Sequence, residues 1–281
     1  MDWKINHIPD QSGRVVLVTG ANSGLGFETA KALLCKGATV IMGCRSMDKG
    51  LYARKTLLQI TSKGNIDLLE LDLADLIEVN RAANQLISKY DRLDLLINNA
   101  GLMAPPRTLS NQGLEIQFAV NHLAHMALTL ILMPLLSKTY GSRVVTVTSG
   151  AQYMGEISWD DLQGEKLYDR WAFYSQSKLA NVMFALELEN RLRNAKHNVS
   201  SMLAHPGLAR TNLQLTSISA NNSWQESLAY KFMGPFFQSA EMGVLPQLFA
   251  ATDPKAQGVS NMDLALISVD IRNFVGTPHL L

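Results

Sequence analysis

The sequence predicts an α/β fold, a single doubly wound domain in which helices flank both faces of a parallel sheet. Short runs of β-branched and aliphatic residues alternate with longer helical patterns along the chain, as in proteins built from strand–helix–strand units. The runs are apolar on both faces, which is typical of a parallel sheet that is covered on both sides. No internal repeat or low-complexity linker interrupts the 281 residues, so we expect one domain that spans 1–281.

The predicted strands and helices alternate in a regular order. We expect strands at 14–19, 38–43, 66–71, 93–98, 142–148 and 198–204. We expect helices at 24–36, 47–62, 75–90, 111–137 and 171–195, a further helix over 239–251 and a last strand within 257–270. Because right-handed crossovers bring the carboxyl ends of parallel strands to one edge of the sheet, we expect ligands to bind there.

Composition and charge narrow the class of protein. Hydrophobic residues make up 47% of the chain and the formal net charge is +1, which suits a buried core and gives no basic surface for nucleic acid. The first residues lack the apolar segment of a signal peptide, and no uninterrupted apolar stretch approaches the ~20 residues of a membrane-spanning helix. Cys35 and Cys44 lack metal or redox spacing. They favour a reducing compartment, and we expect a cytoplasmic protein.

A glycine-rich turn follows the first predicted strand. Gly20 suits a tight turn, Gly24 lets the backbone approach a phosphate, and Gly26 lets the following helix pack closely on the strand. In this arrangement backbone N–H groups and a helix N-terminus receive the pyrophosphate of a dinucleotide. The spacing is GxxxGxG and departs from the commoner GxGxxG, so a purely structural turn is the alternative.

Residues after the next three strands would select the cofactor. Arg45 follows the second strand, where an arginine accommodates the 2′-phosphate of NADP and an acidic residue would favour NAD. Asp72 ends the third strand and either accepts a hydrogen bond from an adenine amino group or caps a turn or helix. Asn98 to Gly101 (NNAG) follow the fourth strand, where small residues let the backbone approach a ring.

Tyr174 and Lys178 form the most specific local motif for catalysis in the sequence. They are four residues apart and so lie on one face of a helix. A phenol has a pKa of about 10, and a neighbouring ammonium together with a positively charged nicotinamide would lower that pKa by stabilising the phenolate. Such a tyrosine can give a proton to a carbonyl oxygen or take one from an alcohol. Ser149, at the end of the fifth strand, adds a hydroxyl; a solvent-facing tyrosine–lysine pair is the alternative.

Together these motifs resemble the short-chain dehydrogenase/reductase family. In the family's order the chain carries TGANSGLG (19–26), NNAG (98–101), Asn121, Ser149, Tyr174, Lys178 and Pro206-Gly207. The segment VNHLAHM (120–126), the separation of 25 between Ser149 and Tyr174, and HPG (205–207) resemble the retinol-dehydrogenase-like branch. The resemblance extends to about residue 251 and implies a Rossmann fold.

The resemblance also implies roles for individual residues. Tyr174 would be the general acid/base, and Lys178 would bind the nicotinamide ribose and tune Tyr174. Ser149, or in principle the adjacent Thr148, would hydrogen-bond the substrate oxygen, and Asn121 would fix its helix and a proton-relaying water. The cofactor would be NADP(H), which supplies the hydride. The implied cofactor-binding residues are Gly20, Asn22, Ser23, Gly24, Leu25, Gly26, Arg45, Asp72, Leu73, Asn98, Ala100, Gly101, Tyr174, Lys178, Pro206, Gly207 and Thr211.

Two segments are expected on the substrate side. The segment 152–170 looks like an insertion beside the site, and 212–238 is expected to form a lid. Apolar side chains recur every four residues from Trp224 to Phe236. Such a stripe forms the roof of an apolar pocket, makes an interfacial membrane contact, or packs on its own domain or a partner subunit. We expect a small lipophilic substrate, because no charged cluster is available to bind a charged group.

We therefore expect an NADP(H)-dependent oxidoreductase that transfers a hydride between the nicotinamide and a lipophilic carbonyl or alcohol. One alternative is a light-dependent protochlorophyllide reductase, a similar class that tends to have threonine in place of Ser149. The other is a catalytically silent NADP-binding regulator. The resemblance also implies a homodimer or homotetramer that forms through 111–137 and 171–195. His122 and His125 are three apart but have no third ligand cluster, so we expect packing residues and no metal site.

Overall fold

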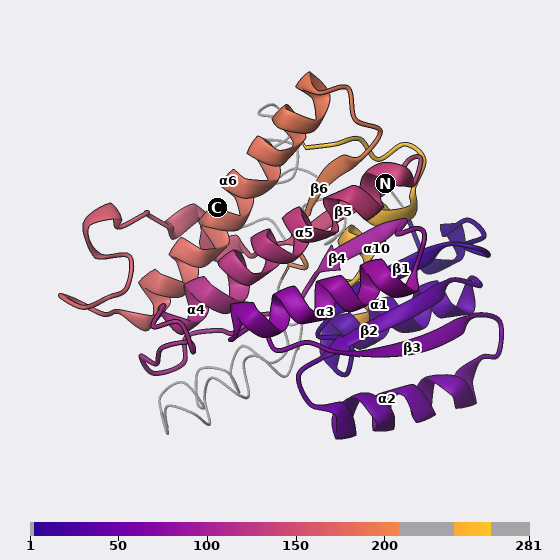
Figure 1. Cartoon of the computed structure of the whole chain (residues 1–281), viewed down its shortest axis with the longest axis horizontal. Helices are drawn as coiled ribbons and strands as arrows, with labels where there is room; N and C mark the ends of the chain where they lie inside the picture. The colour runs from indigo at the N-terminus through magenta and orange to yellow at the C-terminus, as the bar shows by residue number, and fades with distance from the viewer. Residues whose placement is uncertain (1–2, 208–238, 260–281) are drawn as a thin grey trace, which may run out of the picture.

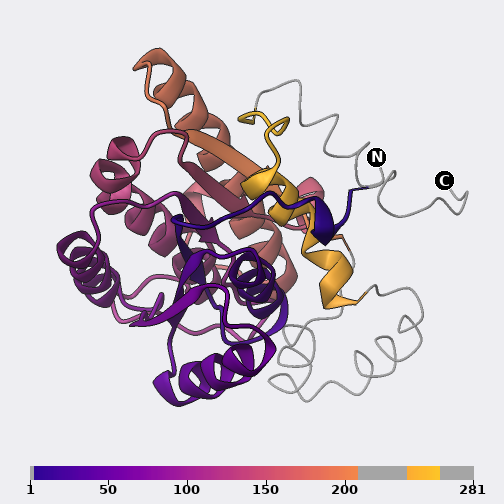
Figure 2. The same ribbon diagram turned by 90° about the vertical axis from the view of Figure 1, so that its right-hand side faces the viewer.

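A computed structural model describes residues 3–207 and 239–259 of the chain. These residues form a six-stranded parallel sheet in the order β3-β2-β1-β4-β5-β6, with helices on both faces (Figures 1 and 2), which confirms the predicted fold class. The strands are β1 (Val15–Thr19), β2 (Thr39–Cys44), β3 (Asn65–Glu70), β4 (Leu95–Asn98), β5 (Arg143–Val147) and β6 (Ser200–Ala204). The main helices are α1 (Gly24–Cys35), α2 (Met47–Ile60), α3 (Leu76–Lys89), α4 (Ile116–Phe118), α5 (Ala124–Lys138), α6 (Arg170–Asn194), α9 (Ala240–Gly243) and α10 (Leu245–Thr252).

The strand order reverses beside β1, which pairs with β2 on one side and β4 on the other. At such a reversal the connections leave toward opposite faces of the sheet and open a crevice outside the carboxyl ends of the strands. The segments that follow β1, β2, β4, β5 and β6 all start at this edge because every pairing is parallel. The predicted motifs are therefore gathered at one edge of the sheet.

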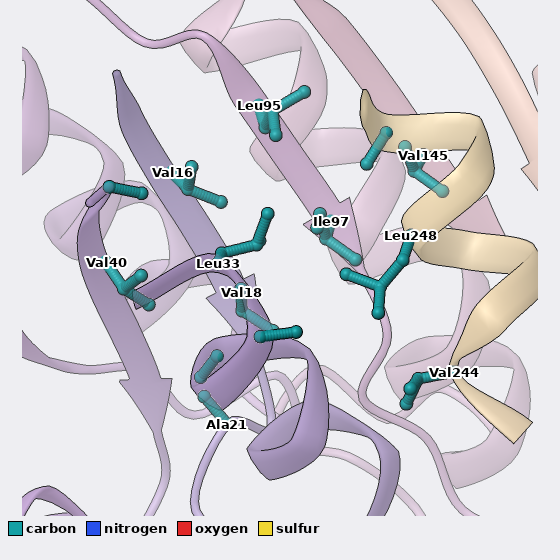
Figure 3. Close-up of a cluster of buried hydrophobic side chains, with 14 of the residues drawn as sticks. Val16, Val18, Ala21, Leu33, Val40, Leu95, Ile97, Val145, Val244 and Leu248 are labelled. Carbon is teal, nitrogen blue, oxygen red and sulfur yellow. The ribbon is translucent and has the colours of Figure 1, made fainter. Parts of the chain in front are cut away.

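Successive side chains of each strand point to opposite faces of the sheet, so the buried apolar side chains form a cluster on each face. Val16 and Val18 on β1 join a cluster with Leu33 of α1 and Leu248 of α10 (Figure 3). Leu17, between the two valines, belongs instead to a second cluster on the face covered by α3, α5 and α6. Burial of strands on both faces explains why the sequence of β1 is continuously apolar.

The long apolar helix begins later than predicted. The sequence predicts a helix from 111, but Leu109 and Glu115 pair as an antiparallel bridge that encloses a tight turn, and the helix starts at Ile116. From there α4, a π-helical turn η2 (Ala119–Leu123) and α5 run on continuously to 138. By length and composition alone this stretch would suffice to cross a membrane, contrary to the sequence expectation, and 61% of its most apolar window is buried inside the fold.

The structure describes the expected insertion fully and the expected last strand only in part. Two short 3-10 helices, η3 (Gly150–Met154) and η4 (Trp159–Asp161), lie in the expected insertion. Of the last strand expected within 257–270, only 257–259 are described; they form no strand, although the Val259 N–H donates to Ser201 O at 2.9 Å beside β6. The remainder of that segment and the expected lid over 212–238 lie outside the described residues.

Candidate active site

The glycine-rich turn after β1 is packed too tightly for side chains. Gly20 has a φ of +67°, and a Cβ there would lie 3.1 Å from the Cβ of Ala100. A Cβ on Gly26 would collide with the carbonyl oxygen of Gly20 and lie 2.7 Å from Asn99 Nδ2. The requirement for glycine at both positions therefore arises from close contact between the turn, α1 and the NNAG segment.

The first turn of α1 begins at the same edge. Gly24, with a φ of +54°, is the first helical residue, and Ser23 at the N-cap makes no side-chain hydrogen bond to the helix. The serine therefore leaves the first-turn N–H groups uncapped, and together with the positive end of the helix dipole they suit an anionic phosphate. Asn22 is half-buried and Leu25 is buried. These residues fit the pyrophosphate of a dinucleotide.

Thr19, the last residue of β1, joins the turn to the NNAG segment. Its hydroxyl accepts hydrogen bonds from the backbone N–H groups of Asn99 and Ala100, each at 2.9 Å, and Asn99 Nδ2 donates to Thr19 O at 2.9 Å. On the β2 side, the sulfur of Cys44 accepts from the two backbone N–H groups that follow Gly20. Burial raises the pKa of this thiol to about 11, so it stays protonated and acts as a fixed partner of the turn.

The structure brings Ser149, Tyr174 and Lys178 together. Tyr174 and Lys178 lie on α6, whose first turn is capped by Asp169 accepting from the Ala172 N–H at 2.7 Å. Ser149 follows β5, its side chain accepts from the Ala151 N–H at 3.3 Å, and its hydroxyl is close enough to Tyr174 to lower the pKa of the phenol. Lys178 Nζ lies 5.8 Å from the centroid of the Tyr174 ring. A hydroxyl, a phenol and an amine from two elements thus meet at the carboxyl edge of the sheet.

Burial is the main influence on the charges of this group. It raises the pKa of Tyr174, and the nearby Ser149 hydroxyl opposes that rise. Burial also lowers the pKa of Lys178 from 10.5 to about 8. In the protein alone, desolvation disfavours the phenolate more strongly than its neighbours favour it. Tyr174 is therefore a proton donor at neutral pH.

Asn121 ties the loop after β4 to the catalytic helix. It lies in η2, where its Nδ2 donates to Leu102 O and to Ser177 Oγ, each at 2.9 Å, and its Oδ1 accepts from the Leu102 N–H at 2.7 Å. Ser177 in turn donates to Tyr174 O at 2.7 Å. Asn121 therefore holds the backbone on both sides of the site, in agreement with the helix-fixing role that the resemblance implies.

Besides Asn99, the NNAG segment contributes a second structural side chain, Asn98, and a close backbone approach at Gly101. Asn98 Nδ2 donates to Thr129 Oγ1 at 3.0 Å, so this amide holds β4 to α5. A Cβ on Gly101 would lie 3.0 Å from Asn121 Oδ1 and 3.6 Å from Lys178 Nζ. The backbone of Gly101 is therefore directly beside the lysine, where a ribose held by Lys178 would contact it.

Ser149 and Thr148 point to opposite sides of the chain, and only one of the two hydroxyl groups faces Tyr174. Thr148 Oγ1 lies 2.7 Å from Gln152 Oε1 and 3.1 Å from Lys178 O, and its side chain is buried between η3 and α6. Ser149, the next residue, carries the hydroxyl that lowers the pKa of Tyr174. Neighbouring residues of an extended segment point to opposite sides, so only one of the two hydroxyls can meet the tyrosine.

The residues expected to select the cofactor lie after β2 and β3. Arg45 is exposed and follows directly on β2, next to the glycine-rich turn. Asp72 Oδ1 accepts from the Ala74 N–H at 2.9 Å, so its carboxylate shapes the turn, while Asp75 caps α3. Leu73 is buried. The turn role and a contact of Asp72 with adenine are compatible, because the carboxylate has a second oxygen.

The predicted proline–glycine pair follows β6. Gly207 has a φ of +66°, and its N–H donates to His205 Nδ1 at 2.7 Å, which turns the chain directly after Pro206. Thr211 lies outside the described residues.

Three polar residues outside the predicted set of site residues support the site. Asn99 bonds Thr19, as described above. Gln247 of α10 donates to Thr29 Oγ1 and, at 3.5 Å, to Asn99 Oδ1. His125 bonds with both ring nitrogens. Asn99 could have been found from its place in NNAG and His125 from its spacing of four after Asn121, whereas nothing in the sequence around Gln247 points to the site.

Within 3–207 and 239–259 the structure places no group of three or more His, Cys, Asp or Glu where they could hold a metal ion. His122 Nδ1 lies 3.2 Å from Asn181 Oδ1, and its ring packs against Phe118 and Phe184. This histidine of η2 is therefore part of the packing against α4 and α6, which is the packing role that the sequence predicts.

Comparisons with known proteins place this geometry in a family. The family model described as short chain dehydrogenase matches residues 14–223. Human retinol dehydrogenase 14 is 38% identical over 269 residues, which cover 88% of this chain and 76% of that protein. The solved structure of an uncharacterized protein from Mycobacterium paratuberculosis is 35% identical with a TM-score of 0.73, and each chain covers 100% of the other.

A short-chain dehydrogenase of Shigella flexneri, solved with NADP, has the same fold at 22% identity, with a TM-score of 0.67 and coverage of 89% of this chain and 95% of that one. The family match covers most of the chain and includes the glycine-rich turn, the NNAG segment and the serine–tyrosine–lysine group whose geometry is described above. The chain belongs to the short-chain dehydrogenase/reductase family and is an oxidoreductase.

Proposed function

We propose that the protein transfers a hydride between NADP(H) and a lipophilic carbonyl or alcohol, with Tyr174 as the general acid/base. The observation that supports this most strongly is that Tyr174 and Lys178 of α6 are buried together at the carboxyl edge of the sheet, with the Ser149 hydroxyl close enough to lower the pKa of the phenol. Two neighbouring hydroxyl groups can both contact one substrate oxygen, and the phenol can exchange a proton with it. The buried amine of Lys178 lies beside the same ring.

In the direction of reduction, Ser149 and Tyr174 donate hydrogen bonds to the carbonyl oxygen, and Tyr174 gives up its proton as negative charge develops there. The nicotinamide, when bound, supplies the hydride. Lys178, with a pKa of about 8, is mostly protonated at pH 7, and its charge stabilises the phenolate that remains. In the direction of oxidation, the same phenolate takes the proton of the alcohol.

The preference for NADP(H) rests on Arg45. Its exposed guanidinium follows β2 at the carboxyl edge, beside the turn that would hold the pyrophosphate. A planar guanidinium matches a phosphate with paired hydrogen bonds. The Shigella flexneri relative was solved with NADP, which agrees with this choice of cofactor.

A lipophilic substrate is supported by the side chains around Tyr174. Trp171 is 42% exposed, and its ring meets that of Tyr174 edge-on at 6.2 Å. Tyr153 and Met154, on η3 directly after Ser149, are 59% and 78% exposed. Aromatic and methionine side chains of this kind give an adaptable apolar approach to a reacting group. The human relative is named as a retinol dehydrogenase, and retinol is a lipophilic alcohol.

The test measures NADPH oxidation with retinal and with medium-chain aldehydes, for the wild type and for Tyr174→Phe. We expect the wild type to turn over and the variant to lose about 10²–10⁴-fold in kcat, with the Kd of NADPH within about twofold of the wild type. Undiminished turnover by Tyr174→Phe would refute the mechanism. Reduction of protochlorophyllide in light alone would assign the pigment-reductase function, and NADPH binding without turnover of any substrate would assign the regulator.

We also propose a homodimer or homotetramer formed through α5 and α6. Leu130 on α5 is 53% exposed and Met183 on α6 is 45% exposed, and a second copy would cover such apolar side chains. Light scattering on the wild type and on Leu130→Glu tests this: the variant is expected to shift toward the monomer. A wild type that is monomeric at micromolar concentration would contradict the proposal.

A further inference from the structure

His125 is a buried histidine whose two ring nitrogens are both engaged. It lies in the first turn of α5 and is 2% exposed. Its Nε2 is 2.9 Å from Thr19 Oγ1, and its Nδ1 is 3.1 Å from Asn121 O. The ring therefore connects the end of β1 to the π-helical turn η2, two elements that are far apart in the sequence.

The donors around Thr19 determine the tautomer of this ring. Thr19 Oγ1 already accepts from two backbone N–H groups of the NNAG segment, so it has one proton left to donate. His125 Nε2, at 2.9 Å, is closer than Ile97 O, at 3.4 Å. With Nε2 accepting, the proton of a neutral imidazole lies on Nδ1 and is donated to Asn121 O.

The ring is also held in its neutral form. Burial lowers the pKa of His125 to about 4, and the charges of Lys178 and His122 act in the same direction. A neutral imidazole with a defined tautomer donates one hydrogen bond and accepts one, as the bonds to Thr19 and Asn121 require.

Beyond Asn121 the hydrogen bonds continue to the catalytic helix. Asn121 Nδ2 donates to Ser177 Oγ, and Ser177 Oγ donates to Tyr174 O. Asn121 lies in a π-helical turn, where the regular i to i−4 pattern of an α-helix is interrupted. A side-chain bond to its carbonyl oxygen therefore fixes a backbone segment that the regular helical pattern does not fix.

We propose that His125 is a positioning residue for the reaction. Its two ring nitrogens hold the NNAG segment and the backbone of Asn121 at fixed positions relative to each other. The inference rests on the proposed function and extends it to a residue that touches neither cofactor nor substrate. The bond from Nε2 to Thr19 acts on the cofactor side, since Thr19 holds the NNAG amides. The bond from Nδ1 acts on the catalytic side, since Asn121 leads through Ser177 to Tyr174.

Two substitutions separate the two bonds. In His125→Gln the side-chain amide reaches the position of Nε2 and keeps the bond to Thr19, but loses the bond to Asn121 O. In His125→Asn the shorter amide reaches the position of Nδ1 and keeps the bond to Asn121 O, but loses the bond to Thr19. His122→Asn serves as a matched control, because His122 lies on the same continuous helix and bonds Asn181 instead.

We expect the two variants to affect different parameters. His125→Gln should lower kcat about tenfold and leave the Kd of NADPH within about twofold of the wild type. His125→Asn should raise the Kd of NADPH about tenfold and leave kcat within about threefold, and the control should change neither by more than about twofold. Equal changes in both variants, or none in either, would overturn the proposal and leave His125 a packing residue.

A spectroscopic measurement on the wild type tests the tautomer and the charge of His125 even where a variant does not fold. Nitrogen-15 NMR of histidine-labelled wild-type protein should show one neutral imidazole with its proton on Nδ1, unchanged from pH 8 to pH 5.5. A proton on Nε2, or protonation within that range, would overturn the assignment. If this signal is found but the wild type neither binds NADPH nor turns over, the proposed function fails while the hydrogen-bonded link stands.

Discussion

Replacing the buried Lys178 with methionine should stabilise the fold and abolish turnover. Burial lowers the pKa of Lys178 from 10.5 to about 8. Because this pKa is lower in the folded than in the unfolded protein, the unfolded state binds the proton more tightly. The charged amine therefore destabilises the folded state fully below about pH 8, and this penalty fades as the pH rises toward 10.5. Methionine has a similar length without the charge and packs adaptably.

The difference between the pKa values of Lys178 in the folded and the unfolded protein sets the size of the stability change in Lys178→Met. Going from 10.5 to about 8 corresponds to about 3 kcal/mol at pH 7. At pH 10 the folded protein has released the proton while the unfolded chain still binds it in part, so about 1 kcal/mol remains. The advantage of Lys178→Met over the wild type should therefore shrink by about 2 kcal/mol between pH 7 and pH 10.

Urea unfolding at the two pH values measures this change, and the comparison of variant with wild type cancels the other titrating groups. Lys255→Met, at an exposed lysine, is the control and should differ little from the wild type at either pH. A stability difference for Lys178→Met that does not change with pH, or that grows toward pH 10, would refute the reasoning. In the same preparations kcat should fall below detection, because the phenolate of Tyr174 loses its neighbouring charge.

Two other substitutions test the cofactor side. Arg45→Ala should weaken NADPH binding by about 1.5–3 kcal/mol, the range for a hydrogen bond to a charged group, with little effect on NADH; an unchanged ratio of the two Kd values would contradict the 2′-phosphate assignment. Gly101→Ala places a methyl 3.0 Å from Asn121 Oδ1 and should lower both thermal stability and kcat/KM, at a cost of about 1–3 kcal/mol. Gly50→Ala, in α2 with ordinary contacts of 3.4–3.5 Å, should instead be neutral or stabilise by up to about 1 kcal/mol, and equal behaviour of the two glycine variants would be evidence against the close approach at 101.

The fold was predictable because its strands are buried on both faces. A run such as Val15 to Val18 is apolar throughout, and the glycine-rich turn that follows Thr19 marks the strand's carboxyl end. The start of the long helix was not predictable in the same way. The turn between Leu109 and Glu115 is closed by a bridge and by the Ser110 N–H donating to Leu114 O, which local propensity does not reveal.

The residues of the site could be predicted from their spacing in the sequence. The directions of their side chains and their charges could not. Tyr174 and Lys178 share a face because they are four apart, whereas the choice between Thr148 and Ser149 depends on which side of an extended segment faces α6. The pKa of Tyr174 depends on burial by distant parts of the chain. The roles of His125 and Gln247 likewise depend on tertiary contacts with Thr19 and Asn99, which no local pattern contains.

The central claim is that Ser149 and Tyr174 act as one proton-transferring unit, and a double-mutant cycle in kcat/KM tests it most directly. Residues that act as a unit are strongly non-additive. We predict that Ser149→Ala combined with Tyr174→Phe is within about threefold of Tyr174→Phe alone. Losses that multiply, so that the double variant is weaker by the product of the two single effects, would contradict the account.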